Sequence, residues 1–259
     1  MKKGKKILII SLVVILLILI AVAVFLFLDN RKHEELERQE EEEIINAEEN
    51  FKKLFLNLEY DENKNGAIYL AYTMEKQVEG KYDVNINIPL LNIETDTANS
   101  VNNEINNSFG KKLLEVVGEN ETYSKYYVDY VAYTNDHIMS LIIKATLKEG
   151  SDAQRVLVKT YNYDLKNNKL VSFAEYLEKA GLDKNIIQNQ IINYIREKSE
   201  ATDTALAEQY NLYVRNIRAD EYLIENVENY YIGEDGKLYI VFAYGNNNPT
   251  ETVDIIIVK

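Results

Sequence analysis

The sequence predicts an α+β protein in which an N-terminal transmembrane helix and a stalk helix precede an antiparallel sheet packed with helices. Three observations support this class: one long uncharged apolar run, blocks of strand-like alternation, and blocks of helical periodicity between them. The strands come in groups and do not alternate one by one with helices, which favours an antiparallel sheet over βαβ units. We expect the sheet to contain a meander and a C-terminal hairpin.

The apolar run covers residues 7–28 and contains no charged side chain. A helix of this length spans the ~30 Å hydrocarbon core of a bilayer. The lysines of residues 1–6 favour a cytoplasmic tail, so the sequence predicts a single-pass protein of the cell membrane with its C-terminal domain outside. A cleaved signal peptide is the alternative, because Ala21–Ala23 fits the small-x-small pattern, although the apolar run continues to Leu28.

Composition restricts the partners of the exported part. Beyond residue 28 the chain carries 25 basic and 42 acidic residues, a net charge of −17. Such a surface repels nucleic acid and favours cationic partners, although it also serves solubility alone. The absence of cysteine excludes disulfides and thiol chemistry. The abundance of Asn, Lys, Ile and Tyr is typical of AT-rich bacterial genomes.

Residues 29–60 are expected to form a charged stalk helix. Residues 31–43 are too charged to bury and include His33, which is not expected to be a ligand. An apolar seam at helical spacing follows, which predicts packing on the domain and weak self-association through the stalk. The seam consists of Ile44, Ala47, Phe51, Leu54 and Leu58.

Asp61–Gly66 matches the first half of a calcium loop, with oxygen-bearing side chains at alternate positions before the glycine. The bidentate glutamate of such a loop is replaced by Tyr72. Asx residues with glycine also form ordinary turns, and a turn is the favoured interpretation.

Residues 61–259 are expected to form one extracytoplasmic domain, or two subdomains over about 61–120 and 121–259. Tyr82–Ile88 alternates apolar and polar residues and predicts a half-buried strand that Pro89 ends. A helix is expected over Thr97–Val117, because apolar residues recur every four positions. Three strands joined by short turns then predict the antiparallel meander. They cover Lys125–Thr134, His137–Leu147 and Arg155–Leu165.

The C-terminal part shows clear helix-start signals. Ser172 and Glu175 have capping-box spacing and predict a short helix ended by Gly181, and Asp183 is expected to cap a longer one. The elements expected after these are a helix over Ala205–Ile217, a hairpin of 230–232 and 237–244 around the turn Gly233–Gly236, and a last strand over Val253–Val258.

The sequence offers no recognisable catalytic constellation. His33 and His137 are the only histidines, and no zinc motif, phosphate-binding glycine loop or cysteine pair is present. His137 opens an apolar strand and is expected to be structural. We therefore predict a non-enzyme without cofactor or metal; an unrecognised carboxylate pair of a hydrolase is the alternative.

A tyrosine-rich strand provides the candidate ligand contacts. Its members lie on both faces of the strand, so about half are expected in the core, and the outward set to stack on sugar rings or a protein surface. The candidates are Tyr126, Tyr127, Tyr130 and Tyr133, with Tyr123 beside them.

Three segments resemble the RsiV-like anti-sigma-factor ectodomain family, whose domain also occurs as the non-catalytic part of the peptidoglycan deacetylase PdaC. The matching segments are 82–109 (YDVNINIPLLN…VNNEINNSF), 157–177 (LVKTYNYDLKNNKLVSFAEYL) and 233–244 (GEDGKLYIVFAY). The resemblance implies an α+β module outside the cell that binds an envelope ligand, either a lysozyme-like cationic protein or peptidoglycan. Residues 1–6 are too few to bind a sigma factor, so anti-sigma activity is not expected. A structural tether is the alternative.

Overall fold

The structure is a computed structural model that describes residues 31, 66–118, 122–202, 207, 210 and 212–259. The chain divides into two units, Met1–Leu56 and Asn57–Lys259, and all strands described below belong to the second. The predicted membrane span (7–28), the stalk (29–60, apart from Arg31) and residues 61–65 of the predicted turn lie outside the described residues. Within the described part, no helix has the length and apolar character needed to cross a bilayer.

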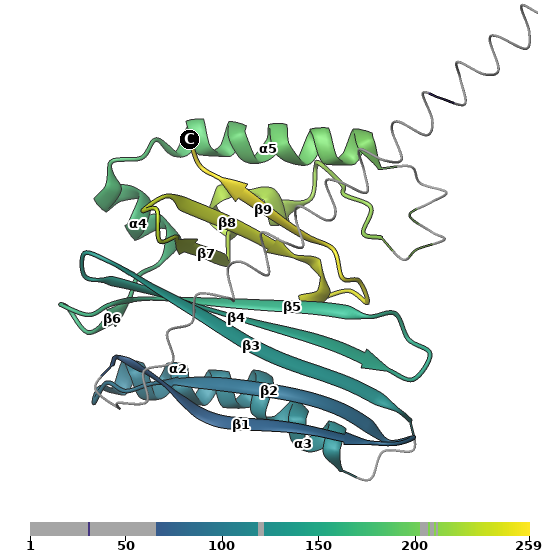
Figure 1. Cartoon of the computed structure of the whole chain (residues 1–259). Coiled ribbons are helices and arrows are strands. Elements are labelled where there is room, and N and C mark those ends of the chain that lie inside the picture. Colours follow the sequence, from purple (N-terminus) through teal and green to yellow (C-terminus); the bar gives the residue numbers. More distant parts are fainter. Residues whose placement is uncertain (1–30, 32–65, 119–121, 203–206, 208–209, 211) are drawn as a thin grey trace, which may run out of the picture. The chain divides into compact units, whose positions relative to one another are not determined.

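The larger sheet has six strands in the order of the chain, and Figure 1 shows them side by side. They are β1 (Ile68–Val78), β2 (Tyr82–Leu91), β3 (Ser124–Asn135), β4 (Ile138–Glu149), β5 (Arg155–Asp164) and β6 (Lys169–Leu170). The antiparallel pairing of β3 with β4 and of β4 with β5 confirms the predicted meander. Strands on both sides of residue 120 share this sheet, so a boundary between two subdomains at about residue 120 would divide the sheet.

The sheet is mixed, which corrects the expectation of a purely antiparallel one. Strands β2 and β3 pair in parallel, with Tyr82 opposite Ser124 and Ile86 opposite Val128. Parallel neighbours need a long crossover. Here α2 (Asp96–Ile105), a π-helical turn (Asn106–Gly110) and α3 (Lys111–Val117) supply it.

Strand β2 also continues through Pro89, where the sequence predicted its end. Pro89 lies opposite Leu70, beside an irregularity in the β1–β2 register between Leu70 and Tyr72. The pairing of β2 with β3 has already stopped at Ile86. A residue without an N–H is tolerated at such a point, because no ladder partner on the β3 side requires a donor.

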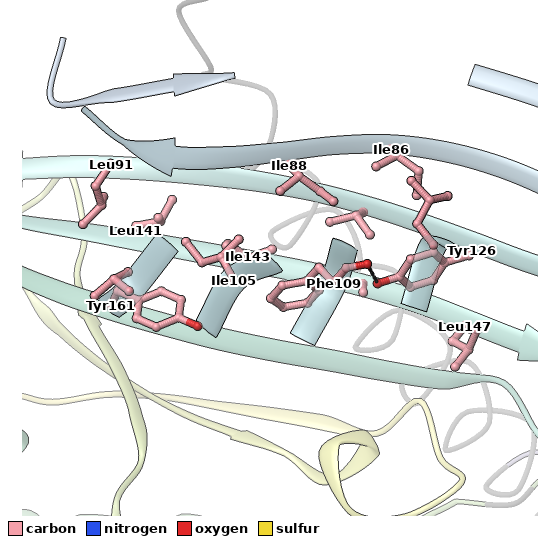
Figure 2. Close-up of a cluster of buried hydrophobic side chains, with 14 of the residues drawn as sticks. Ile86, Ile88, Leu91, Ile105, Phe109, Tyr126, Leu141, Ile143, Leu147 and Tyr161 are labelled. Atoms are coloured by element: carbon pink, nitrogen blue, oxygen red, sulfur yellow. Dashed lines mark hydrogen bonds between the residues drawn. The ribbon is translucent and has the colours of Figure 1, made fainter. Parts of the chain in front are cut away.

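The helical crossover packs on one face of β1–β5, and its apolar side faces the strands. Apolar residues recur every four positions, which is more than the 3.6-residue turn of an α-helix. The π-helical turn takes up the extra residue and keeps Ile105, Phe109 and Leu113 on the buried side. In Figure 2, Ile105 and Phe109 point into the side chains of the strands. The helix ends at Gly118, as predicted.

A second, three-stranded antiparallel sheet holds the predicted hairpin and last strand, which corrects the expectation that they share a sheet with the meander. It consists of β7 (Asn229–Ile232), β8 (Leu238–Ala243) and β9 (Val253–Ile257). Its core includes residues of α4 (Phe173–Ala180) and α5 (Lys184–Ala201), and Figure 1 shows α5 lying along this sheet. The Ser172–Glu175 capping box, the left-handed Gly181 and the Asp183 cap are confirmed.

The helix predicted over Ala205–Ile217 is wrong for its second half, because residues 212–216 are not helical. Arg215 binds the buried Asp254 carboxylate through two hydrogen bonds of 2.6 and 2.8 Å. The ring of Tyr213 stacks on that of Tyr244 with 4.0 Å between centroids. These contacts place Tyr213 and Arg215 on one side of the segment, a period of two that no helix can supply.

Polar side chains join the two sheets at the free edge of β7. The Asn162 amide donates to the Tyr230 carbonyl at 2.7 Å, and Ser140 Oγ accepts from the Ile232 N–H at 3.0 Å. The Tyr230 N–H donates to Thr160 Oγ1 at 3.0 Å. The outward backbone groups of β7 are therefore satisfied by side chains of β4 and β5.

The outer edge of β5 is covered in the same way. The Val158 N–H donates to Asn246 Oδ1, and the Asn246 amide donates back to the Val158 carbonyl, both at 2.9 Å. The Val156 N–H donates to the Thr250 carbonyl at 3.1 Å. Gly245 allows this approach, because a Cβ there would meet the Val156 carbonyl oxygen. The edge thus has no free donor at these positions.

Candidate binding site

The predicted tyrosines of β3 separate according to the alternation of the strand. Tyr126 and Tyr130 point toward the helical crossover and pack in the core beneath it. Tyr126 is 1% exposed, and its hydroxyl donates to the Phe109 carbonyl at 3.1 Å. A ligand therefore has no access to Tyr126, which is a correction to its selection as a ligand contact. Tyr130 is half-buried against the same core.

Tyr127 and Tyr133 lie on the opposite face of β3, as does the half-buried Tyr123. The Tyr133 ring packs against the Tyr231 ring of β7, with 6.3 Å between centroids, so it belongs to the junction between the sheets. Tyr127 lies away from this junction and pairs in register with Asn85 of β2. Tyr127 is therefore the predicted residue best placed to meet a ligand.

The surroundings of Tyr127 are polar because this face of β1–β3 is turned to solvent. The helices cover the other face, so the strands carry apolar residues on the covered side and polar residues on the open side. The side chains on the open face are exposed or half-buried. They are Thr73, Glu75 and Gln77 of β1 and Asp83, Asn85 and Asn87 of β2.

A hollow of about 470 Å³ lies at the end of this face. It is lined by Glu75, Lys76, Gln77, Asp83, Val84, Asn85 and Tyr127. Its size is within the range of small-ligand sites, and its lining offers carboxylate, amide and phenol groups.

The electrostatics of the hollow favour a positively charged group. The Tyr127 hydroxyl donates to Asp83 Oδ2 at 2.6 Å, and this hydrogen bond to the carboxylate raises the pKa of Tyr127 to about 12. The Lys76 ammonium lies 5.8 Å from the centroid of the Tyr82 ring, on the side of the core. The lining contains two carboxylates, those of Glu75 and Asp83. The lining therefore carries two carboxylates against the one ammonium of Lys76.

A larger hollow of about 630 Å³ lies near the start of α2, but its polar groups already serve the fold. The Asn102 side chain accepts from the Leu91 N–H at 2.7 Å and donates to the Leu91 carbonyl at 3.0 Å. Thr95 caps the helix by accepting from the Ala98 N–H. We therefore prefer the hollow beside Tyr127.

His137 and Asp164 form a charged cluster between the β3–β4 turn and α4. His137 Nδ1 lies 2.6 Å from Asp136 Oδ2, and its Nε2 lies 3.7 Å from Asp164 Oδ2. Burial alone would raise the pKa of the Asp164 carboxyl, but hydrogen bonds from Asn167 and Lys179 outweigh burial and hold it well below its ordinary value. In the described part of the chain, no three His, Asp or Glu side chains are grouped to hold a metal ion.

Sequence reasoning found Tyr127 but missed its neighbours Glu75 and Asp83. Asp83 stood in the predicted strand as an ordinary polar position. Glu75 lies in β1, which the sequence analysis did not predict. The two strands pair over most of their length and form a hairpin around Glu79–Lys81, and Gly80 in that turn was the available signal.

Neither a family model nor a curated protein matches this sequence. Among the solved structures similar in fold are two DUF3298 family proteins. A DUF3298 family protein from Pseudomonas aeruginosa PAO1 is 12% identical, covers 73% of this chain and 86% of its own, and has a TM-score of 0.42. A member of the same family from Bacteroides fragilis is also 12% identical, covers 68% and 80%, and has a TM-score of 0.39. Similarity at this level establishes neither family membership nor function.

Proposed function

We propose that the chain is a non-catalytic, membrane-tethered extracytoplasmic module that binds a cationic, lysozyme-like protein of the cell envelope. Peptidoglycan is the alternative ligand. The observation that carries the proposal is the hollow beside Tyr127, where two carboxylates and a half-buried aromatic ring meet on an open face of the sheet.

The charge of the chain supports a cationic partner. The exported residues carry a net charge of −17, and the hollow contributes Glu75 and Asp83 to that excess. Complementary charge accelerates the encounter of two proteins and excludes partners of like charge. Salt should therefore slow association more than it speeds dissociation, because the Debye length falls to about 8 Å at physiological ionic strength.

The position of Tyr127 supports a role in affinity. It stands on β3, a strand with neighbours on both sides, and its hydroxyl is fixed by Asp83. A ring held in one orientation loses little conformational entropy on binding, and tyrosine is enriched at the energetic centres of interfaces.

The first prediction concerns Tyr127. We expect the full chain in detergent micelles to bind a lysozyme on a biosensor surface, and Tyr127→Ala to raise the Kd about tenfold or more. Tyr72→Ala is the matched control, since Tyr72 is an exposed tyrosine outside the hollow. Sedimentation with purified sacculi measures the alternative ligand in parallel.

The outcomes separate the candidate functions. Retention by sacculi alone would replace the protein ligand by peptidoglycan. If neither lysozyme nor sacculi are bound at any salt concentration, the structural tether becomes the preferred function. Hydrolysis of sacculi by the chain would favour the carboxylate-dependent hydrolase.

A further inference from the structure

The edges of the two sheets differ in whether their outward backbone groups have hydrogen-bond partners. The outer edge of β5 is satisfied by Asn246 and Thr250, and the edge of β7 by Ser140, Thr160 and Asn162. Strand β1 forms the opposite edge of the six-stranded sheet. An edge strand offers a row of backbone donors and acceptors to any further strand.

The register of the β1–β2 hairpin identifies the outward groups of β1. The Lys81 carbonyl, just before β2, accepts from the Ser124 N–H. The backbone N–H and C=O groups of the odd-numbered residues of β2 therefore face β3, and those of the even-numbered residues face β1. In an antiparallel pair, hydrogen-bonded residues alternate along each strand. Since Val78 pairs with Tyr82, the backbone groups of Thr73, Glu75 and Gln77 are directed away from β2. Among the described residues, none supplies them with a backbone partner.

The side chains of the same three residues lie on the open face that contains the hollow. Thr73 Oγ1 donates to Asn87 Oδ1 at 3.2 Å across the β1–β2 pair, and Gln77 pairs in register with Asp83. A strand added beside β1 would run about 4.8 Å from it, with alternate side chains on this face. A side chain opposite Glu75 would thus stand at the rim of the hollow.

We propose that the outer edge of β1 over Thr73–Val78 and the adjoining hollow form one peptide-binding site. An extended segment of a partner protein adds to the sheet as a further strand and places a lysine or arginine side chain beside Glu75 and Asp83. The proposal rests on the proposed function, because it names the chemistry of the partner that the same hollow accepts.

The two parts of this site have different roles. The backbone of β1 supplies hydrogen bonds that any extended segment can make, while the pocket selects one alternate side chain. The carboxylates of Glu75 and Asp83 match a basic group and repel an acidic one. A glycan lacks the alternating amide donors and carbonyl acceptors that the edge of β1 requires. The irregularity beside Leu70 limits the regular edge to the residues from Tyr72 onward.

The test begins with a display library of random ten-residue peptides, selected on the full chain in nanodiscs. We expect the selected peptides to contain a basic residue flanked by alternating β-forming residues. Methylation of single backbone nitrogens in one selected peptide should weaken binding about tenfold at every second position and leave the positions between unchanged.

Variants of β1 then identify the edge. Thr73→Pro removes an N–H that is directed outward, so the fold should survive while peptide affinity falls about tenfold. Thr73→Val keeps the N–H and is the matched control. Glu75→Lys should change the selected peptides from basic to acidic, whereas Glu79→Lys, in the exposed turn before β2, should not. Circular dichroism and the Tm verify that each variant is folded.

Each result decides the proposal. If no peptide is selected, if N-methylation shows no period of two, or if a folded Thr73→Pro variant binds as tightly as the parent, strand addition is overturned. Lysozyme binding that depends on Tyr127 in the absence of peptide binding would leave the proposed function standing and remove only this inference. Peptide binding without lysozyme or sacculus binding would leave this inference standing and remove the proposed function.

Discussion

Two adjacent tyrosines show how the environment of a residue decides its role. Tyr126 and Tyr127 follow each other in β3 and therefore point to opposite faces of the sheet. Tyr126 donates to the Phe109 carbonyl within the π-helical turn, and its ring is buried. Tyr127 donates to the Asp83 carboxylate at the rim of the open face. The same chemical group is buried in the core in one case and lies on the open face of the sheet in the other.

The second prediction tests the buried hydroxyl. Tyr126→Phe removes the donor to the Phe109 carbonyl and should lower the free energy of unfolding by about 1 kcal/mol. Tyr127→Phe is the control, because water can replace its hydrogen bond and its effect on stability should be smaller. Urea denaturation followed by circular dichroism measures both. Equal losses for the two variants would contradict the assignment of Tyr126 to the core.

The third prediction concerns pH and Asp164. The hydrogen bonds from Asn167 and Lys179 hold the pKa of the buried Asp164 below its unfolded value of about 3.8, with His137 and Lys169 adding positive charge nearby. A carboxyl whose pKa is lowered by folding stabilises the native state above its unfolded pKa and loses this contribution as pH falls. The free energy of unfolding should therefore decrease on acidification below about pH 4.

Asp164→Asn should flatten this acid dependence. Asp152→Asn, at an exposed aspartate on the β4–β5 turn, should leave it unchanged. Denaturant titrations at a series of pH values give the slopes. An unchanged slope for Asp164→Asn would show that other carboxyls cause the acid sensitivity.

At the level of elements, the helix caps and tight turns were predictable, because each is determined by residues close together in the sequence. The capping box at Ser172, the left-handed glycine at Gly181 and the hairpin turn Gly233–Gly236 each act within a few residues, and the structure confirms them. The non-helical segment at Tyr213 and Arg215 depends on Tyr244 and Asp254, which are distant in sequence, so propensity alone predicted a helix.

Strand β1 escaped prediction for a related reason. On the face of the sheet that the helices cover, its side chains are Tyr72, Met74, Lys76 and Val78, of which Tyr72 and Lys76 are exposed, and the register irregularity after Leu70 shifts the pattern. Lys76 interrupts the apolar series, although its ammonium lies over the Tyr82 ring. Tyr127 was predictable from the alternation of β3 and Asp83 from that of β2, but Glu75 required the position of β1.

The fourth prediction concerns the junction of the two sheets. Asn162→Ala should lower the free energy of unfolding by about 1–3 kcal/mol, because it leaves the Tyr230 carbonyl without its donor and Ser140 without its acceptor. Asn85→Ala, on the open face, is the matched control and should change stability little. Urea denaturation distinguishes them, and similar losses would argue against a role of the Asn162 amide in joining the sheets.

At the scale of the molecule, two hydrophobic clusters share one structural unit. The first lies between the crossover helices and β1–β5, and the second between α4, α5 and the three-stranded sheet. Side chains of β4 and β5 satisfy the edge of β7, so neither sheet can separate without exposing unpaired polar groups. The net charge was predictable from composition; the mixed sheet was not, because the parallel β2–β3 pair forms between distant segments.

The fifth prediction is that residues 57–259 unfold cooperatively and without dependence on a metal ion. Far-ultraviolet circular dichroism and the near-ultraviolet signal of the tyrosines should give coincident transitions. A chelator should not change the Tm of the full chain. Separate transitions would indicate independent sheets, and a lower Tm with EDTA would support calcium binding at Asp61–Gly66.

The covered edge of β5 has a consequence for the time course of folding. Asn246 follows Val158 by 88 positions. As the chain leaves the ribosome, the meander can form well before the residues that close its edge have been synthesised. During that interval the nascent sheet has two open edges, and pairing with a neighbouring nascent chain competes with completion of the fold. We therefore expect chains truncated before residue 246 to aggregate more readily than the full chain.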